Sequence, residues 1–286
     1  MNDRLTLCIK ELIMIEKLEA LLNTSAPKIN FTNKQVDFML KNIGNTNPYI
    51  RDNLVYTLFA TGFMNSAFTL VQQKHIIDYF FNNDLLFKDI LEPQSDYVLI
   101  RSFSALLGAI ILECDDDACI LNDNQRQELF KWSIQYLKLE NDYRSFVTDK
   151  GWAHAIAHGS DFLGSSLSHT KFHLTNVNDL FITLQKVINR LETPFLDIEE
   201  ARLASALKLG VQAENMSVED FIKGIQYVDK ELWQQYDAAI LNTCYRLNAW
   251  IHILHHWLIF FSNDTKIKTI PKQKLDYYYN KMGYNF

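Results

Sequence analysis

Glycine and proline are scarce in this sequence, with 9 and 5 among its 286 residues. Both residue types disfavour helix interiors, so their scarcity favours a helical fold. No segment matches GxxxxGK[ST], GxGxxG or GxSxG, which excludes the common phosphate-binding loops and the serine-hydrolase elbow. No stretch has the composition of a linker either, and we predict a single helical-repeat domain over residues 1–286.

Cysteine pairs, basic charge and long apolar runs are also lacking. The four cysteines form neither a CxxC pair nor a zinc-finger spacing, which indicates reduced thiols in a cytoplasmic protein. A net charge of −6 argues against a nucleic-acid partner. The most apolar run, residues 247–261, holds three histidines and is shorter than the roughly 18–20 residues of a membrane-spanning helix. We therefore expect a soluble protein, without a signal peptide, that does not bind a membrane.

A helical period is present along the whole chain and predicts an all-α fold. Thr32 with Gln35, and Ser217 with Asp220, have the spacing of helix-start caps. The expected helices span residues 3–22, 33–43, 48–63, 66–82, 96–113, 123–139, 150–167, 177–192, 198–213, 218–237, 239–261 and 272–281.

Four of these segments share a polar position that recurs along the chain. Arg51, Arg101, His154 and Arg202 follow one another at intervals of 50, 53 and 48 residues. Helical repeats of the HEAT type are somewhat shorter, about 40–47 residues, and the segment DYVLIRSFSALLG is similar to their pattern. The recurrence predicts an α-solenoid of HEAT-like helix pairs (an α-α superhelix), whose inner helices line a concave surface.

The segments YVLIRSFSALL and DKGWAHAIAHGSDFL resemble an uncharacterised bacterial family, catalogued as domain of unknown function 2785. The likeness extends over most of the chain, and GWAHAIAH is its most specific part. The resemblance implies a bacterial, all-helical, HEAT-like protein. It transfers no catalytic residue to this sequence.

The histidine-containing segment at residues 150–167 is the strongest candidate for a site. On a helix, His154, His158 and Asp161 share one face with Ser165. Trp152 falls on the opposite face, so we expect Trp152 to be buried and the polar residues to face a groove shared with Arg101. Three uses remain open, namely a metal site, a metal-free ligand or catalytic pocket, and a packed or solvated polar face. Because no HExxH motif or adjacent His-Asp pair is present, we expect no bound metal and no cofactor.

Further candidates lie in two other expected helices. Arg101 has only small residues beside it on its own face, which leaves space for a carboxylate or phosphate, although an ion pair with a neighbouring repeat is the alternative. For Arg202 we expect an ion pair with Glu199. A second histidine-rich face carries His252, His255 and His256, opposite a stripe of large apolar residues. The candidate ligand-binding residues are therefore Arg101, His154, His158, Asp161, His252 and His256.

Two functions fit this pattern best. The first is a binding protein whose concave groove, lined by histidine, arginine and aspartate, takes a peptide, a protein or a small anionic ligand. The second is a hydrolase that uses His154, His158 and Asp161 as acid/base or metal-assisted groups. The fold signal is stronger than the chemical signal and favours binding, and the sequence leaves open both catalysis and oligomeric state. The acidic run CDDDAC at residues 114–119 lacks EF-hand spacing, and we expect a solvated loop there.

Overall fold

The computed structural model describes residues 2–24, 28–92, 94–173 and 177–284. The predicted all-α fold is confirmed, since 70% of the chain is helical and the described residues form a single hairpin of two short strands. The elements are α1 (Asn2–Leu22), α2 (Asn33–Lys41), the π-helix η2 (Tyr49–Tyr56), α3 (Thr57–Met64), α4 (Leu70–Asn82), α5 (Tyr97–Ala118), α6 (Asp123–Leu139), β1 (Phe146–Val147), β2 (Gly151–Trp152), α7 (Ala155–Ser168), α8 (Val177–Asn189), α9 (Glu199–Gln212), α10 (Val218–Gln235), α11 (Leu241–Phe260) and α12 (Thr265–Lys281).

The ends of the helices follow local capping chemistry. Thr32 and Gln35 form the expected capping box, in which each side chain accepts the other residue's backbone N–H. Ser217 accepts the N–H of Asp220, also as expected. The predicted start of the last helix is wrong, because α12 begins under an Asp264 cap and continues through Pro271. A proline inside a helix removes one backbone hydrogen bond, and here its ring is buried in the packing.

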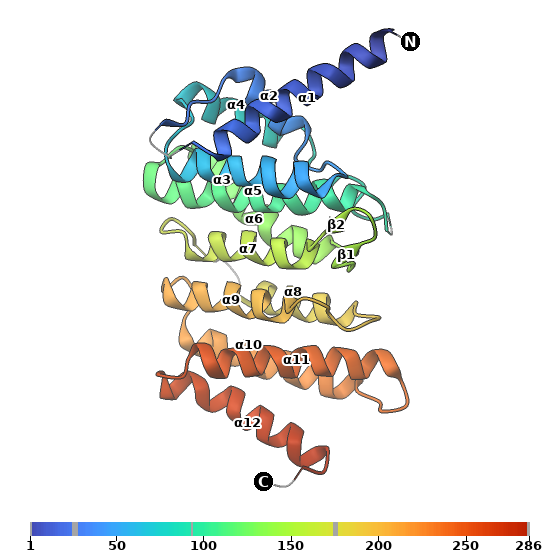
Figure 1. The fold of residues 1–286 in the computed structure, drawn as a ribbon. Helices are drawn as coiled ribbons and strands as arrows, with labels where there is room; N and C mark the ends of the chain where they lie inside the picture. The colour runs from blue at the N-terminus through green and yellow to red at the C-terminus, as the bar shows by residue number, and fades with distance from the viewer. Residues whose placement is uncertain (1, 25–27, 93, 174–176, 285–286) are drawn as a thin grey trace.

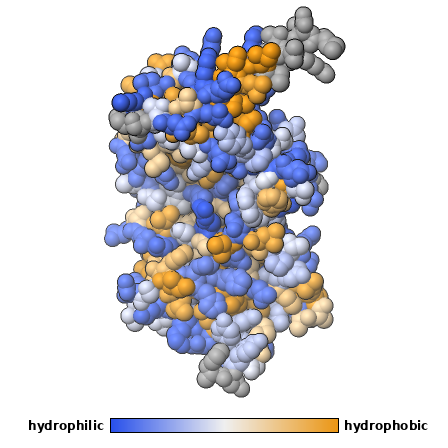
Figure 2. Space-filling model, in the orientation of Figure 1, coloured by the Kyte–Doolittle hydropathy of each residue, from blue (hydrophilic) through white to orange (hydrophobic). Residues whose placement is uncertain are grey.

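The helices stack in sequence order between the two ends of the chain (Figure 1). Helices α5, α7, α9 and α11 contact one another in succession, and α6, α8, α10 and α12 form a second succession beside them. Figure 2 shows an apolar patch at the N-terminal end, over α1, where Ile9, Leu12 and Ile13 are exposed.

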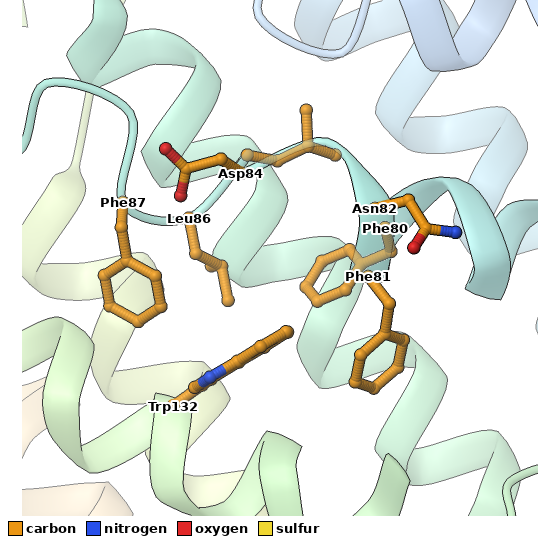
Figure 3. A pocket seen from close by; sticks show the side chains of 8 residues that line it. Phe80, Phe81, Asn82, Asp84, Leu86, Phe87 and Trp132 are labelled. Atoms are coloured by element: carbon orange, nitrogen blue, oxygen red, sulfur yellow. The ribbon is translucent and has the colours of Figure 1, made fainter.

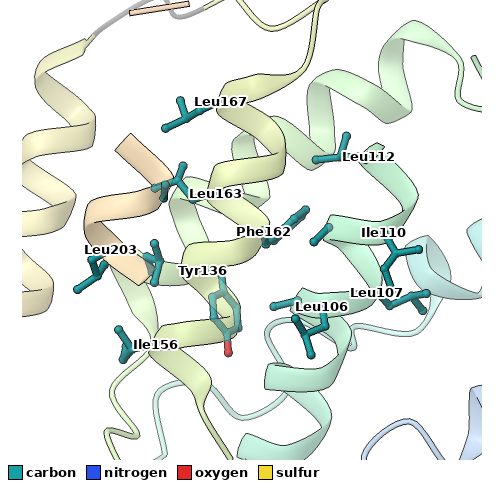
Figure 4. Packing of buried hydrophobic residues seen from close by; sticks show 14 of the residues in the cluster. Leu106, Leu107, Ile110, Leu112, Tyr136, Ile156, Phe162, Leu163, Leu167 and Leu203 are labelled. Carbon is teal, nitrogen blue, oxygen red and sulfur yellow. The ribbon is translucent and has the colours of Figure 1, made fainter. Parts of the chain in front are cut away.

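Helix α5 packs closely against α7 in the core. Phe162 points from α7 towards α5 among buried aliphatic side chains (Figure 4). Gly108 makes room for this ring, because a Cβ at that position would lie 2.8 Å from a ring carbon. Helix α5 is long and apolar enough to cross a bilayer, but 78% of its most apolar window is buried inside the molecule. In this structure α5 therefore packs as a core helix.

A buried ion cluster joins the end of α5 to α6 and α7. Asp115 accepts hydrogen bonds from Arg126 at 2.5 Å, from the Leu121 N–H at 2.7 Å and from His169 at 3.0 Å. Asp115 is 1% exposed and still belongs to the helix, so the expected solvated loop at 114–119 is wrong. Burial alone would raise the pKa of Asp115. The bonds from His169, Arg126 and Leu121 outweigh burial and lower this pKa from 3.8 to about 2.

We predict that Asp115→Asn lowers the free energy of unfolding at pH 7 by about 2–3 kcal/mol, because it removes a buried charge partner. A carboxylate with a depressed pKa stabilises the fold above its unfolded pKa and loses this contribution as pH falls towards 2. The difference between the variant and the parent protein should therefore shrink between about pH 4 and pH 2. Urea unfolding followed by circular dichroism measures both effects.

The exposed Asp117 supplies the matched control for this measurement. Asp117→Asn makes the same charge change two residues away and should leave the unfolding free energy within about 0.5 kcal/mol. Equal losses in the two variants would contradict a specific role for Asp115.

Candidate functional site

The predicted helix at 150–167 begins later than expected. Phe146–Val147 pairs with Gly151–Trp152 in an antiparallel hairpin, and α7 starts only after His154. Gly151 and His154 have φ angles of +78° and +50°, which a right-handed helix cannot contain. The carbonyl oxygens of Lys150 and Trp152 accept hydrogen bonds from Arg51 instead, at 2.9 and 3.2 Å. His154 is therefore the N-cap residue of α7 and not a member of a helical polar face.

Trp152 is 39% exposed, so its expected burial is wrong. Its ring stacks on the His154 ring, with 4.6 Å between centroids and 2° between planes. The Phe146 and Trp152 rings form a T-shaped pair with 5.1 Å between their centroids. Trp152 lies in β2, before α7 begins, so it cannot occupy the buried face of that helix as we expected.

His158 lies on α7 but does not face an open groove. Its residue exposure is 9%, and its Nδ1 atom lies 2.7 Å from the Ser102 Oγ of α5. The Phe103 and His158 rings form a T-shaped pair with 5.0 Å between their centroids. Burial, with a smaller effect from nearby positive charges, lowers the pKa of His158 well below its usual range. His158 therefore stays neutral at pH 7, and its predicted place in a groove is wrong.

Arg101 is fully buried and forms an ion pair, which was the alternative weighed for it. Its Nε and Nη2 atoms donate to the two carboxylate oxygens of Glu140, both at 2.8 Å, and Nη1 donates to the Lys88 carbonyl. The groove that we expected Arg101 to share with the histidines is therefore not formed. Its assignment as a ligand-binding residue stays a prediction.

A groove does run across the middle of α5, α7 and α9. It has a volume of about 280 Å³, and its lining includes small residues of the three helices, such as Ala109, Gly164 and Ala206. We call it the α5–α7–α9 groove. Its polar lining residues are Tyr56, Glu113, Ser160, Asp161, Ser165, Arg202 and Ser205.

Two polar contacts organise this groove. Arg202 donates from Nη1 to both Asp161 oxygens, at 2.8 and 2.7 Å, and Ser165 donates to Glu113 at 2.8 Å. The Arg202 side chain is 56% exposed and that of Asp161 27%. Burial raises the pKa of Asp161, against the opposing charge of Arg202. Burial also raises the pKa of Tyr56, and Asp161 and Glu113 add to that effect.

The partner of Arg202 differs from the one expected. We predicted an ion pair with Glu199, but Glu199 is buried, where it accepts hydrogen bonds from Ser145 and from the backbone of Asp197. Of the predicted histidine face, Asp161 and Ser165 line the groove, whereas His154 and His158 do not.

His154 lies beside a carboxylate from the loop before α9. Its Nε2 atom is 3.4 Å from Asp197 Oδ2, and its side chain is 16% exposed. Burial lowers the pKa of His154, and the charge of Asp197 opposes this effect. The rings of His154 and His158 lie near each other, with 5.5 Å between centroids. Their polar partners differ, however, and Asp161 pairs with Arg202 instead of with either histidine. Within the described ranges, no group of three or more His, Cys, Asp or Glu side chains is placed to hold a metal ion.

The second histidine-rich face is on α11, as expected, opposite the buried Trp250, Leu254, Trp257 and Phe261. His252 is 61% exposed at its side chain and pairs with Glu200 at 3.2 Å. It lines a small pocket of about 240 Å³ with Tyr245 and Asn248. His256 stacks on Phe260 at 5.7 Å, and burial lowers its pKa. This pocket is separate from the α5–α7–α9 groove.

A cleft lined by three arginines was missed by the sequence analysis. It measures about 630 Å³ and is lined by Arg144 before β1, Arg190 after α8 and Arg246 on α11. We call it the arginine cleft. These arginines are 46 and 56 residues apart in the sequence and belong to no motif, so no local signal could have grouped them.

An aromatic pocket of about 260 Å³ lies between the end of α4 and α6. Figure 3 shows the rings of Phe80, Phe81 and Phe87 arranged around Trp132. The two polar lining residues, Asn82 and Asp84, come from the end of α4 and the turn after it. The pocket holds no combination of groups suited to catalysis.

Comparison with known proteins identifies a family. A family model described as protein of unknown function (DUF2785) matches residues 86–260, from the segment before α5 to the end of α11. No curated protein and no solved structure matches the chain. The matched range contains the arginine cleft and all of the α5–α7–α9 groove except Tyr56.

We predict that Trp152→Ala costs only about 1 kcal/mol of unfolding free energy, because the ring is partly exposed and loses mainly its stacking on His154. Trp257→Ala, at a fully buried ring whose N–H donates to the Ala204 carbonyl, should cost about 3–5 kcal/mol. Guanidinium unfolding of the two variants checks this ordering, and a loss at Trp152 as large as that at Trp257 would contradict it.

We predict that His158 makes the fold less stable as pH falls. The unfolded chain takes up a proton near pH 6.5 whereas folded His158 stays neutral, so this residue should remove about 1.4 kcal/mol of stability at pH 5.5. His158→Gln should reduce the loss of unfolding free energy between pH 7.5 and pH 5.5 by that amount. The exposed His173 provides the control, and a His173→Gln variant that changed the pH dependence equally would exclude the assignment to His158.

Proposed function

This chain belongs to the DUF2785 family of proteins of unknown function, and on that premise we propose that it is a binding protein. In this proposal its helix pairs form a HEAT-like α-solenoid, and the α5–α7–α9 groove holds a positively charged segment of a protein partner. The single observation that carries the proposal is the solvent-exposed ion pair between Asp161 and Arg202, which lies in the same groove as Glu113.

The contacts between helices support the proposed solenoid. In a solenoid each repeat contacts only its neighbours, so that equivalent helices follow one another along the molecule. Here α5, α7, α9 and α11 do so on one side, with α6, α8, α10 and α12 beside them. Arg101 reinforces the contact between successive units, because it donates to Glu140, 39 residues further along the chain. Arg51 reaches further, to the Lys150 carbonyl 99 residues along the chain.

The charge of the groove favours a basic occupant. Two carboxylates, Glu113 and Asp161, line the groove together with one guanidinium, Arg202. Burial raises the pKa of Asp161, although Arg202 opposes this effect. A lysine or arginine side chain would supply the missing positive charge.

The Asp161–Arg202 pair can exchange partners with a ligand. A solvent-exposed ion pair contributes only about 0–1 kcal/mol, and more than half of the Arg202 side chain is exposed. A peptide can therefore place a basic group on Asp161 and Glu113 while Arg202 moves to a carbonyl or carboxylate of the same peptide. Ser165 and Ser205 supply hydroxyls for its backbone.

The hydrolase alternative has less support from the geometry. A general base must reach the substrate through a hydrogen bond or a single water, and His158 is 9% exposed. Asp161 is held by Arg202, and His154 lies beside Asp197. A binding role needs none of these groups to act together in a reaction.

We predict that a library of random peptides, each about a dozen residues long, becomes enriched in lysine and arginine when it is selected on the protein. The selected peptides should bind the Glu113→Gln/Asp161→Asn double variant at least tenfold more weakly, since it removes both groove carboxylates. Fluorescence anisotropy with the labelled peptides measures the affinities.

The matched control is the Glu92→Gln/Asp117→Asn double variant, which makes the same charge change at two exposed positions outside the groove. It should bind the peptides as tightly as the parent protein does. Peptides without basic enrichment, or equal losses in both double variants, would rule out the α5–α7–α9 groove as the binding site.

A further inference from the structure

We infer that the arginine cleft binds a small organic phosphate. The cleft lies between the loop that leads from α6 to β1, the loop between α8 and α9, and the first half of α11. Its volume of about 630 Å³ is within the range of roughly 300–1,000 Å³ that is usual for small-molecule sites.

The lining of the cleft carries an excess of positive charge. Glu192 is the one carboxylate among the lining residues, which include Arg144, Arg190 and Arg246. Asp142 pairs with Arg144 at 2.5 Å. In the stretches of chain that the structure describes, neither Arg190 nor Arg246 has a carboxylate within ion-pair distance. Two guanidinium charges are therefore left for an anion.

The guanidinium groups are held in place before any ligand arrives. At the end of α6, Arg190 donates from Nη2 to the Lys138 carbonyl at 2.6 Å and from Nη1 to the Leu137 and Glu140 carbonyls at 3.5 and 3.4 Å. Arg246 donates from Nε to the Leu191 carbonyl at 3.3 Å. Carbonyl partners fix the position of a guanidinium without neutralising its charge. A donor side chain that is already fixed loses less conformational entropy on binding than a mobile one does. The cleft is therefore preorganised to bind an anion.

Phosphate fits this arrangement better than a single carboxylate does. A phosphate monoester carries close to two negative charges at pH 7 and three acceptor oxygens. It can accept paired hydrogen bonds from more than one guanidinium, whereas a carboxylate offers one charge and two oxygens. Asn141 and Thr193 add uncharged donors to the same lining.

The apolar lining residues indicate that the phosphate is attached to an organic group. Phe146 is 51% exposed and Leu196 73% exposed, and both line the cleft with Pro194. Tyr143 stacks on Phe195 with ring centroids 6.1 Å apart and donates its hydroxyl to the Val187 carbonyl. These surfaces can cover a ring or a short carbon chain that inorganic phosphate lacks.

Isothermal titration calorimetry with phenyl phosphate, inorganic phosphate and benzoate tests this inference on the full chain. Phenyl phosphate should bind at least tenfold more tightly than either of the others. Arg246→Gln should weaken its binding at least tenfold, because the Arg246 guanidinium is held by a backbone carbonyl and its charge is left for the ligand. Glu192→Gln removes the lining carboxylate from an exposed position and should strengthen binding.

Arg202→Gln is the matched control, because it removes an arginine from the α5–α7–α9 groove and should leave phenyl phosphate binding unchanged. Failure of the peptide experiment would leave this result unaffected, since the two sites share no lining residue. Inorganic phosphate or benzoate binding as tightly as phenyl phosphate would overturn the inference. So would unchanged affinity in both Arg246→Gln and Glu192→Gln.

Discussion

The buried ion pair between Arg101 and Glu140 holds α5 against the loop after α6, which leads to the hairpin and lines the arginine cleft. Both side chains are fully buried, and a buried charge is tolerated only when its partner and its hydrogen bonds are present. Glu140 also accepts the backbone N–H groups of Asn141 and Asp142, which fixes the loop after α6. The carbonyl of Ser145 in that loop accepts from the N–H of His154. The position of the hairpin end and of the arginine cleft therefore depends on one buried pair.

Arg51 has a related role in the preceding unit of the stack. It connects η2 to the hairpin through two carbonyl oxygens and lies over the Phe103 ring at 4.7 Å. Gly151 is needed at this contact, because its φ is +78° and a Cβ there would lie 2.9 Å from Pro48. The backbone of the hairpin is thus held against η2, and Trp152 and His154 stack on each other at the end of the hairpin.

The two proposed sites differ in the sign of their charge, although the chain as a whole is acidic. The α5–α7–α9 groove has more carboxylates than guanidiniums, and the arginine cleft has the reverse. Net charge describes solubility and long-range attraction, and here it says little about either site. The hydrogen bond between Ser145 and Glu199 joins a lining residue of the cleft to the start of α9, so the two sites share some of their framework.

The sequence by itself determined most of the helices and the caps at Thr32 and Ser217, because these depend on neighbours within about four residues along the chain. The apolar stripe of Trp250 and Trp257 opposite His252 was predicted correctly for this reason. The tertiary structure alone decided that Trp152 is exposed, that His158 and Asp115 are buried, and that Arg144, Arg190 and Arg246 meet. Each of these outcomes depends on partners far away in the sequence, such as Arg51 for the hairpin and His169 for Asp115. Helical periodicity carries no information about such partners, since it repeats the same local geometry wherever the helix lies.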